Sequence, residues 1–119
     1  MENDTIEVAF ILPRTLGAMA AKFYVKTPKP MREKGWYLKE GSTVKGIVSM
    51  ASGNNINDVS RLVNTYKKSD GSFTKAADWH KVRGTAIITD GQIDRTVEVH
   101  WYQCKDIGKV EFKVKRWDV

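Results

Sequence analysis

The sequence predicts an α+β fold in which N-terminal helices pack on a C-terminal antiparallel sheet, with a β-α-β-β-β core. Apolar and polar side chains alternate through residues 80–89, 92–104 and 109–117, as they do in half-buried strands. Short turn sequences separate these three segments. Residues 56–67, which precede them, place apolar side chains at helical spacing. Together these features indicate helical elements on a three-stranded meander.

The length, composition and charge indicate one globular domain with an anionic partner. The chain has 119 residues, of which 41% are hydrophobic, so it can bury one core. Its net charge of +6 favours nucleic acid as the partner, before acidic membranes or acidic proteins. The single cysteine, Cys104, excludes an internal disulfide and a cysteine-based zinc site. No apolar run approaches the ~18 residues that span a bilayer, so we expect no membrane insertion.

Residues 1–40 are interpreted as a helical or irregular lead-in to a core at 41–119, within a single domain. Pro13 suits the first position of a helix, and residues 27–30 favour an extended connector after it. The predicted helix carries an apolar stripe formed by Leu16, Met19, Ala20 and Phe23.

The middle of the chain predicts one strand and one helix. Residues 43–50 alternate as a strand, with Val44, Gly46 and Val48 on one side. A flexible loop follows and ends in Asn55, a good N-cap for the helix at 56–67. The apolar face of that helix consists of Ile56, Val59, Leu62, Val63 and Tyr66. Arg61 is predicted to point outward.

Turn lengths set the register of the meander. With Asp90-Gly91 as a two-residue hairpin loop, Thr89 pairs with Gln92. With residues 105–108 as the second loop, Cys104 pairs with Lys109. The first hairpin then pairs Lys81 with His100, Val82 with Val99 and Arg83 with Glu98. The second pairs His100 with Lys113, Val99 with Val114 and Glu98 with Lys115.

Both hairpins sort the side chains onto the same two faces. The core face carries Val82, Ala86, Ile88, Val97, Val99, Trp101, Val110, Phe112 and Val114. The opposite, solvent-open face carries Lys81, Arg83, Thr85, Glu98, His100, Tyr102, Glu111, Lys113 and Lys115. This face therefore gathers an imidazole, several cations and carboxylates.

These groups are the ones that cleavage of RNA by transesterification requires. Histidine exchanges protons near neutral pH, as the attacking 2′-hydroxyl and the leaving 5′-oxygen need. Cations stabilise the charge that builds on the phosphate, so neither a metal nor a cofactor is needed. The candidate catalytic residues are His100, Lys81, Lys113, Glu98 and Tyr102. Glu111 is the alternative to Glu98 as the carboxylate that orients the imidazole or acts as the partner base. The candidate RNA- and phosphate-binding residues are Arg83, Lys115, Arg61 and Thr85.

Residues 44–117 also resemble a known superfamily. The similarity lies in VKGIVSMAS at 44–52, DVSRLVNTY at 58–66, DWHKVRG at 78–84, EVHWY at 98–102 and GKVEFKVK at 108–115. These segments resemble the nucleases of phages and polymorphic toxins that are grouped around barnase, colicin D, RelE and EndoU. His100 and Lys81 match motif positions, and Lys113 and Lys115 match the basic last strand.

The resemblance implies a barnase- or RelE-like fold and a toxin ribonuclease, of the contact-dependent inhibition or phage head-linked kind. It implies RNA as the substrate, often tRNA, and an immunity protein as a second partner. The toxin would act in the bacterial cytoplasm, with delivery into a target cell as one route.

Two other functions use the same basic face. One is a nucleic-acid-binding module without catalysis, and the other is a phage structural or interaction domain that meets an acidic partner. Binding alone needs no titrating group, so His100 separates these alternatives from an enzyme. His100 also has an ordinary interpretation as a surface histidine, and Lys113 and Lys115 as lysines that guard an edge strand.

Overall fold

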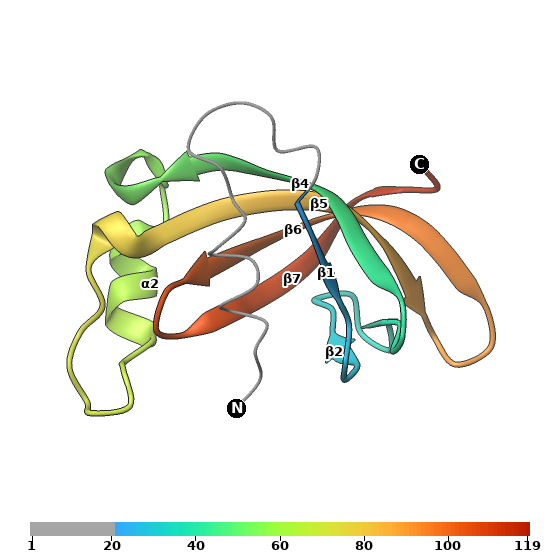
Figure 1. The fold of residues 1–119 in the computed structure, drawn as a ribbon, viewed down its shortest axis with the longest axis horizontal. Helices are drawn as coiled ribbons and strands as arrows, with labels where there is room; N and C mark the ends of the chain where they lie inside the picture. The colour runs from blue at the N-terminus through green and yellow to red at the C-terminus, as the bar shows by residue number, and fades with distance from the viewer. Residues whose placement is uncertain (1–20) are drawn as a thin grey trace.

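The structure is a computed structural model that describes residues 21–119, which form an antiparallel sheet with one α-helix (Figure 1). The strands are β1 (Lys22–Tyr24), β2 (Lys29–Pro30), β3 (Tyr37–Leu38), β4 (Thr43–Ser52), β5 (Trp79–Thr89), β6 (Asp94–Cys104) and β7 (Gly108–Trp117). The helical elements are α2 (Val59–Thr65) and the 3-10 turns η2 (Gly53–Asn55) and η3 (Ala76–Asp78). This arrangement confirms the α+β class in its coarse form.

The predicted N-terminal helix is wrong at its C-terminal end. Phe23, its last apolar residue, lies in β1, and the part of the predicted helix at 13–20 lies outside the described residues. The reason is a tertiary one. Lys22–Tyr24 pairs with Thr43–Lys45 of β4, and the alternating pattern of the strand buries Phe23 between two exposed neighbours.

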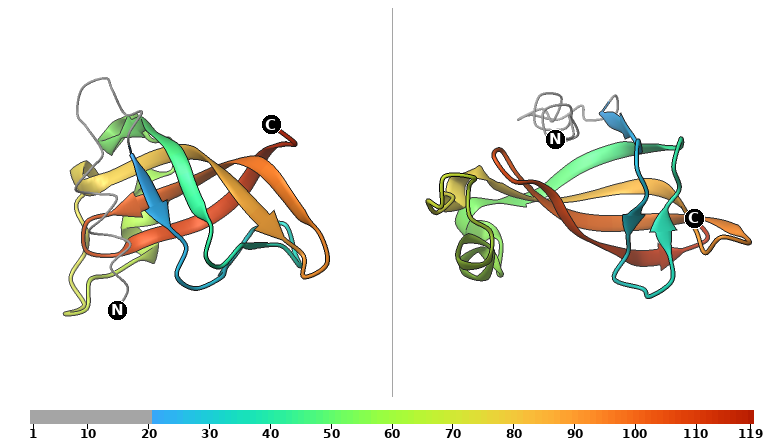
Figure 2. Two further views of the ribbon diagram at one scale, coloured as in Figure 1. Left: turned by 45° about the vertical axis from the view of Figure 1, so that its right-hand side comes forward. Right: turned by 90° about the horizontal axis from the view of Figure 1, so that it is seen from below.

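The sheet curls around its core, with β5 as the central strand (Figure 2). One edge of β5 pairs with β4 and then with β3, and the other edge pairs with β6, which pairs with β7. The segment between β2 and β3 reaches the outer edge of β7. There the Arg32 amide donates to the Phe112 carbonyl at 2.8 Å, and Glu33 accepts from the Val114 amide at 3.0 Å. The curled sheet is thus bridged across its open side.

The enclosed core confirms most of the predicted core face. Val82, Ala86, Ile88, Val97, Val99, Trp101 and Phe112 are buried there, and Val114 packs against them. The described part of the predicted lead-in adds Phe23, Val25, Met31 and Leu38. Trp101 joins the two groups, because its ring lies 5.8 Å from that of Phe23 and 5.1 Å from that of Phe112.

Helix α2 covers one end of the opposite face of the sheet (Figure 1). Val59 and Leu62 pack there on Trp79 of β5 and Cys104 of β6. The apolar face predicted for this helix is confirmed, although the helix is shorter than 56–67. Asp58 rather than Asn55 is its N-cap, because Gly53–Asn55 forms a separate 3-10 turn.

The sequence pattern assigned Val110 to the core face, and that assignment is wrong. Val110 pairs with Tyr102 and packs against the cluster under α2. The cause is a β-bulge at Glu111, whose φ of 60° lies in the left-handed region and which shifts the register of β7 by one residue. Val110 and Phe112 consequently point to opposite faces of the sheet.

A second irregularity, in β4, changes which residues of that strand share a face. Gly46 has φ of 65°, and the pairing with β5 shifts between Lys45 and Val48. Val44 and Ile47 are therefore the fully buried pair, although strict alternation placed them on opposite sides of the strand. A residue without a Cβ adopts this conformation at little cost, which explains the bulge at Gly46.

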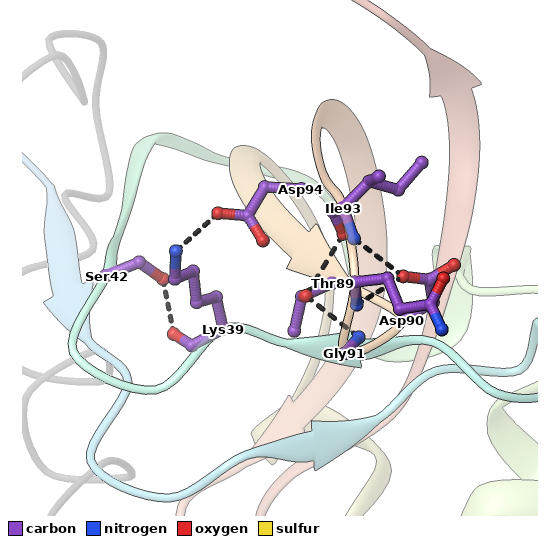
Figure 3. Close-up of polar contacts among 8 residues, drawn as sticks. Lys39, Ser42, Thr89, Asp90, Gly91, Ile93 and Asp94 are labelled. Carbon is purple, nitrogen blue, oxygen red and sulfur yellow. Dashed lines mark hydrogen bonds and ion pairs between the residues drawn. The ribbon is translucent and has the colours of Figure 1, made fainter.

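The β5–β6 loop has four residues, 90–93, rather than two, because its own side chains close it (Figure 3). The Asp90 carboxylate accepts from the amides of Gln92 and Ile93, each at 2.9 Å. The Thr89 hydroxyl donates to the Ile93 carbonyl and accepts from the Gly91 amide, both at 3.1 Å. Thr89 thus pairs with Asp94 and not with Gln92.

This longer loop moves β6 along β5 by two residues. Every side chain keeps its face, because the strand period is also two, but the partners change. Arg83 lies opposite His100, Lys81 opposite Tyr102 and Thr85 opposite Glu98. The predicted pairs Lys81–His100 and Arg83–Glu98 are therefore wrong.

The β6–β7 hairpin is partly as predicted. Cys104 pairs with Gly108 rather than Lys109, but the bulge at Glu111 restores the predicted register beyond it. The pairs His100–Lys113 and Val99–Val114 are confirmed. A second register shift then places Arg116 rather than Lys115 opposite Glu98.

Candidate functional site

A pocket with a volume of about 490 Å³ opens on the sheet face beside α2. Strands β5, β6 and β7 form its floor, α2 borders it at one end, and the segment at 30–32 borders it along β7. Five predicted site residues line it: Arg61, Lys81, His100, Tyr102 and Lys113. The sheet register and the covering helix therefore bring most of the predicted site together.

His100 and Glu98 form a hydrogen-bonded pair at the edge of this pocket. The His100 Nε2 lies 2.9 Å from the Glu98 Oε2, and the two side chains are only 10% and 21% exposed. They are neighbours on one face of β6, two residues apart. Glu98 also lies 3.7 Å from the guanidinium of Arg116.

The environment keeps the imidazole neutral and the carboxylate charged. Burial lowers the pKa of His100; the hydrogen bond and the charge of Glu98 raise it, and Lys115 and Lys81 lower it further. The hydrogen bond with His100 lowers the pKa of Glu98, and Arg116 and Arg83 lower it too. An ionised carboxylate only accepts hydrogen bonds, so Nε2 is the donor of this pair. The lone pair of the neutral ring is then on Nδ1, which can act as a base.

Two cationic residues pair with His100 across the sheet, whereas the charges that lower the pKa of its ring are those of Lys115 and Lys81. Arg83 of β5 and Lys113 of β7 lie directly opposite His100, at positions whose Cβ atoms are separated by about 5 Å. The sequence predicted Lys81 in the place that Arg83 occupies. Lys81 lies one pair further along, opposite Tyr102, and still lines the pocket.

A second network forms the helix side of the pocket. Glu111 accepts from both terminal nitrogens of Arg61, at 2.9 and 3.1 Å, and from the Tyr66 hydroxyl at 2.7 Å. The Tyr102 hydroxyl donates to Asp58 at 3.2 Å, and Arg61 lies 3.5 Å from the same carboxylate oxygen. Arg61 is therefore fixed between two carboxylates rather than left extended into solvent.

These contacts shift the ionisation of the network consistently. The hydrogen bond with Glu111 raises the pKa of Arg61, and the hydrogen bond with Arg61 lowers the pKa of Glu111. Burial raises the pKa of Tyr66 to about 12, and the bond to Glu111 adds to that shift. Burial also raises the pKa of Tyr102. Both phenols therefore stay protonated at neutral pH.

The remaining predicted site residues lie around the pocket rather than in its lining. Arg83 is exposed, Thr85 lies opposite Glu98, and Lys115 is exposed where β7 is irregular. Asp58 also lines the pocket and was not among the predicted site residues, whereas Glu111 was expected on the open face as the alternative to Glu98 for orienting His100. The sequence signal for Asp58 was its spacing from Arg61, which lies three residues later in the helical region.

A buried thiol lies apart from the pocket lining. Cys104 is buried, and burial raises the pKa of its thiol to about 11, so it stays protonated. Among residues 21–119, no three side chains of the metal-binding types come together. In the same part of the chain no helix has the length and apolar character needed to cross a membrane.

Comparison of the chain with models of known protein families, with curated proteins and with solved structures finds no match. The geometry of the pocket and the residues that line it are therefore the basis for assigning a function.

Proposed function

We propose that the chain is a metal-independent endoribonuclease of the toxin type, with its active site in the pocket around His100. The observation that carries the proposal is the His100–Glu98 pair, which provides a neutral, oriented imidazole among cations. Histidine with a carboxylate partner is a common base in active sites. The cations beside it suit a phosphodiester better than a neutral substrate.

The proposed reaction is an internal transesterification of RNA. The 2′-oxygen bonds to phosphorus while the bond from phosphorus to the 5′-oxygen breaks. Nδ1 of His100 takes the proton of the 2′-hydroxyl, and the ammonium group of Lys113 gives a proton to the leaving 5′-oxygen. The products are a 2′,3′-cyclic phosphate and a free 5′-hydroxyl. Lys81 and Arg83 stabilise the charge on the phosphate during this step.

The other pocket residues bind and position the substrate. Glu98 holds the His100 ring and stabilises the imidazolium that forms. Tyr102 presents a protonated phenol ring, which can stack on a base or donate to a phosphate oxygen. Arg61, held by Glu111, presents a fixed guanidinium to the phosphate. The pocket volume of about 490 Å³ lies within the range typical of small-ligand sites, so it suits a short piece of a single strand rather than a duplex.

The biological part of the proposal rests on the resemblance of residues 44–117 to toxin nucleases. In that setting the substrate is tRNA, the site of action is the bacterial cytoplasm, and an immunity protein blocks the pocket in the producing cell. The net charge of +6 agrees with both an RNA substrate and an acidic inhibitor.

The test is cleavage of total RNA by the purified chain in the presence of a chelator. The wild type is expected to produce fragments that end in 2′,3′-cyclic phosphate. His100→Ala should lower the rate by at least about 100-fold, since general base catalysis contributes 10²–10⁴-fold. His80→Ala is the matched control, because it removes the only other imidazole, which lies outside the pocket lining.

The same variants separate the enzyme from its alternatives in cells. Wild-type expression should arrest the growth of a bacterial host, and His100→Ala should relieve the arrest. Retention of RNA without cleavage by a folded wild type would instead support a binding module. A strict requirement for a divalent cation would refute the proposed chemistry.

A further inference from the structure

The face that carries His100 continues beyond the pocket, across β5 and β4 to the short strand β1. Pairing places five residues in one row: Lys22, Lys45, Thr85, Glu98 and Arg116. Directly opposed residues of neighbouring strands point to the same face. The row thus leads from the carboxylate partner of His100 to two lysines that lie outside the pocket lining.

The two lysines at the far end of this row repel each other. Lys22 and Lys45 are exposed and lie directly opposite each other, an arrangement that costs stability on a sheet. No ion pair within residues 21–119 involves either of them, whereas Lys39 and Arg95 both have acidic partners. Two opposed cations that have no ion-pair partner among residues 21–119 form a site that attracts an anion.

An aromatic ring lies beside these cations. Tyr24 is 53% exposed, and the Lys22 ammonium group lies 5.9 Å from the centre of its ring. Lys26, which is also exposed, follows two residues later. Exposed rings among cations are typical of surfaces that bind single-stranded nucleic acid, where bases stack on the rings and the cations contact phosphates.

Protection of an exposed edge explains only part of this arrangement. Among the described strands β1 pairs with β4 alone, so Lys22 suits an edge strand, where lysine discourages aggregation. Lys45 is different, because β4 at that position pairs with β1 on one side and with β5 on the other. An interior strand position has no free edge to protect.

We propose that the surface formed by Lys22, Tyr24 and Lys45 binds the single-stranded RNA that runs out of the pocket. The inference rests on the proposed function of the pocket and adds that the substrate is a strand of several nucleotides. Three strand spacings of about 4.8 Å separate β6 from β1, so the two sites lie about 14 Å apart along the sheet. A dinucleotide held in the pocket would not reach this surface.

The experiment measures binding of a fluorescein-labelled 12-nucleotide oligouridylate to the His100→Ala protein by anisotropy at several salt concentrations. Lys22→Ala/Lys45→Ala should raise Kd and lower the slope of log K against log[salt] by about 1.4, or about 0.7 for each phosphate that a lysine no longer neutralises. Tyr24→Ala should raise Kd by about 5- to 150-fold, whereas Tyr24→Phe should retain the wild-type value.

The matched control is Lys75→Ala/Lys105→Ala, which removes the same charge at two exposed lysines outside this surface. It should change the salt slope less than Lys22→Ala/Lys45→Ala does. In the cleaving protein, the Lys22/Lys45 variant should raise KM for the 12-mer and leave cleavage of the dinucleotide UpA unchanged. Equal effects of the two double variants on Kd and salt slope would overturn the inference.

The outcomes also separate this inference from the proposed function. RNA binding that depends on Lys22 and Lys45, in a wild type that does not cleave, would refute the enzyme and leave the binding surface intact. Cleavage that is insensitive to both lysines on the 12-mer would retain the enzyme and refute the surface. No RNA binding by any of these proteins would refute both.

Discussion

Replacement of Glu98 by Gln tests whether this carboxylate controls the base of the proposed reaction. Glu98 is the group that raises the pKa of His100, while burial, Lys115 and Lys81 lower it. The amide of Gln still accepts the hydrogen bond from Nε2, so the ring keeps its orientation. What disappears is the negative charge 2.9 Å from the ring.

The size of the effect follows from the kind of hydrogen bond that is replaced. A bond with a charged partner is worth about 1.5–3 kcal/mol and a neutral one about 0.5–1.5 kcal/mol. The difference of about 1–2 kcal/mol corresponds to a fall of about 5- to 30-fold in kcat. The pKa of His100 falls further below its ordinary value, so the acidic limb of the pH–rate profile moves to lower pH.

The assay is the initial rate of cleavage of a fluorogenic RNA oligonucleotide between pH 4.5 and 8. Glu40→Gln is the control, because it removes the same charge from an exposed position outside the pocket. The wild-type rate should rise with pH through a midpoint below 6.5, the ordinary pKa of histidine. An acidic limb that moves to higher pH in Glu98→Gln, or a profile and rate that do not change, would refute the reasoning.

Three further predictions concern stability, each measured by urea unfolding. Gly84→Ala should cost about 1–3 kcal/mol, because its Cβ would meet three atoms of neighbouring strands at 3.1–3.3 Å; an unchanged midpoint would contradict this. Glu111→Gln should lower the free energy of unfolding by about 1–2 kcal/mol, because its bonds to Arg61 are partly exposed to solvent. Adding Arg61→Ala to this variant should lower the free energy of unfolding little further. Burial lowers the pKa values of His100 and His80, so the unfolded chain binds more protons. Their contribution is complete above about pH 6.5 and is lost as the pH falls through the folded values, so the urea midpoint should be lower at pH 5.5 than at pH 7.5.

The alternation of side chains predicted the faces of β5 and β6 because a strand has a strict period of two. The predicted register between β5 and β6 was wrong by two residues, because Asp90-Gly91 was interpreted as a complete hairpin loop. In the structure the Asp90 carboxylate caps two amides beyond Gly91, and this capping favours a four-residue loop. A shift by an even number preserves faces, so His100 keeps its predicted face, with Arg83 in place of Lys81 opposite it. On that face it is buried rather than exposed to solvent as predicted.

Bulges limit what the pattern predicts. A non-glycine residue with positive φ is uncommon, and nothing in the local sequence marks Glu111 for that role. The conformation is compensated by contacts distant in the chain, since the Glu111 carboxylate meets Arg61 and Tyr66 of the α2 region. The position of such a bulge therefore depends on tertiary contacts and not on the local sequence. The sequence pattern consequently placed both Arg61 and Glu111 among the candidate polar side chains but did not predict that they bind each other.

The burial of His100 is the observation that best separates catalysis from binding on this face. A surface that only binds phosphates gains from exposed lysines and arginines, and desolvating a neutral imidazole adds nothing to its affinity. Here His100 is 10% exposed, its Nε2 donates to a carboxylate, and that carboxylate lies near Arg116. This arrangement orients the ring and keeps one nitrogen unprotonated at neutral pH. Both features suit the proposed proton transfer, and neither increases the attraction between the face and a polyanion.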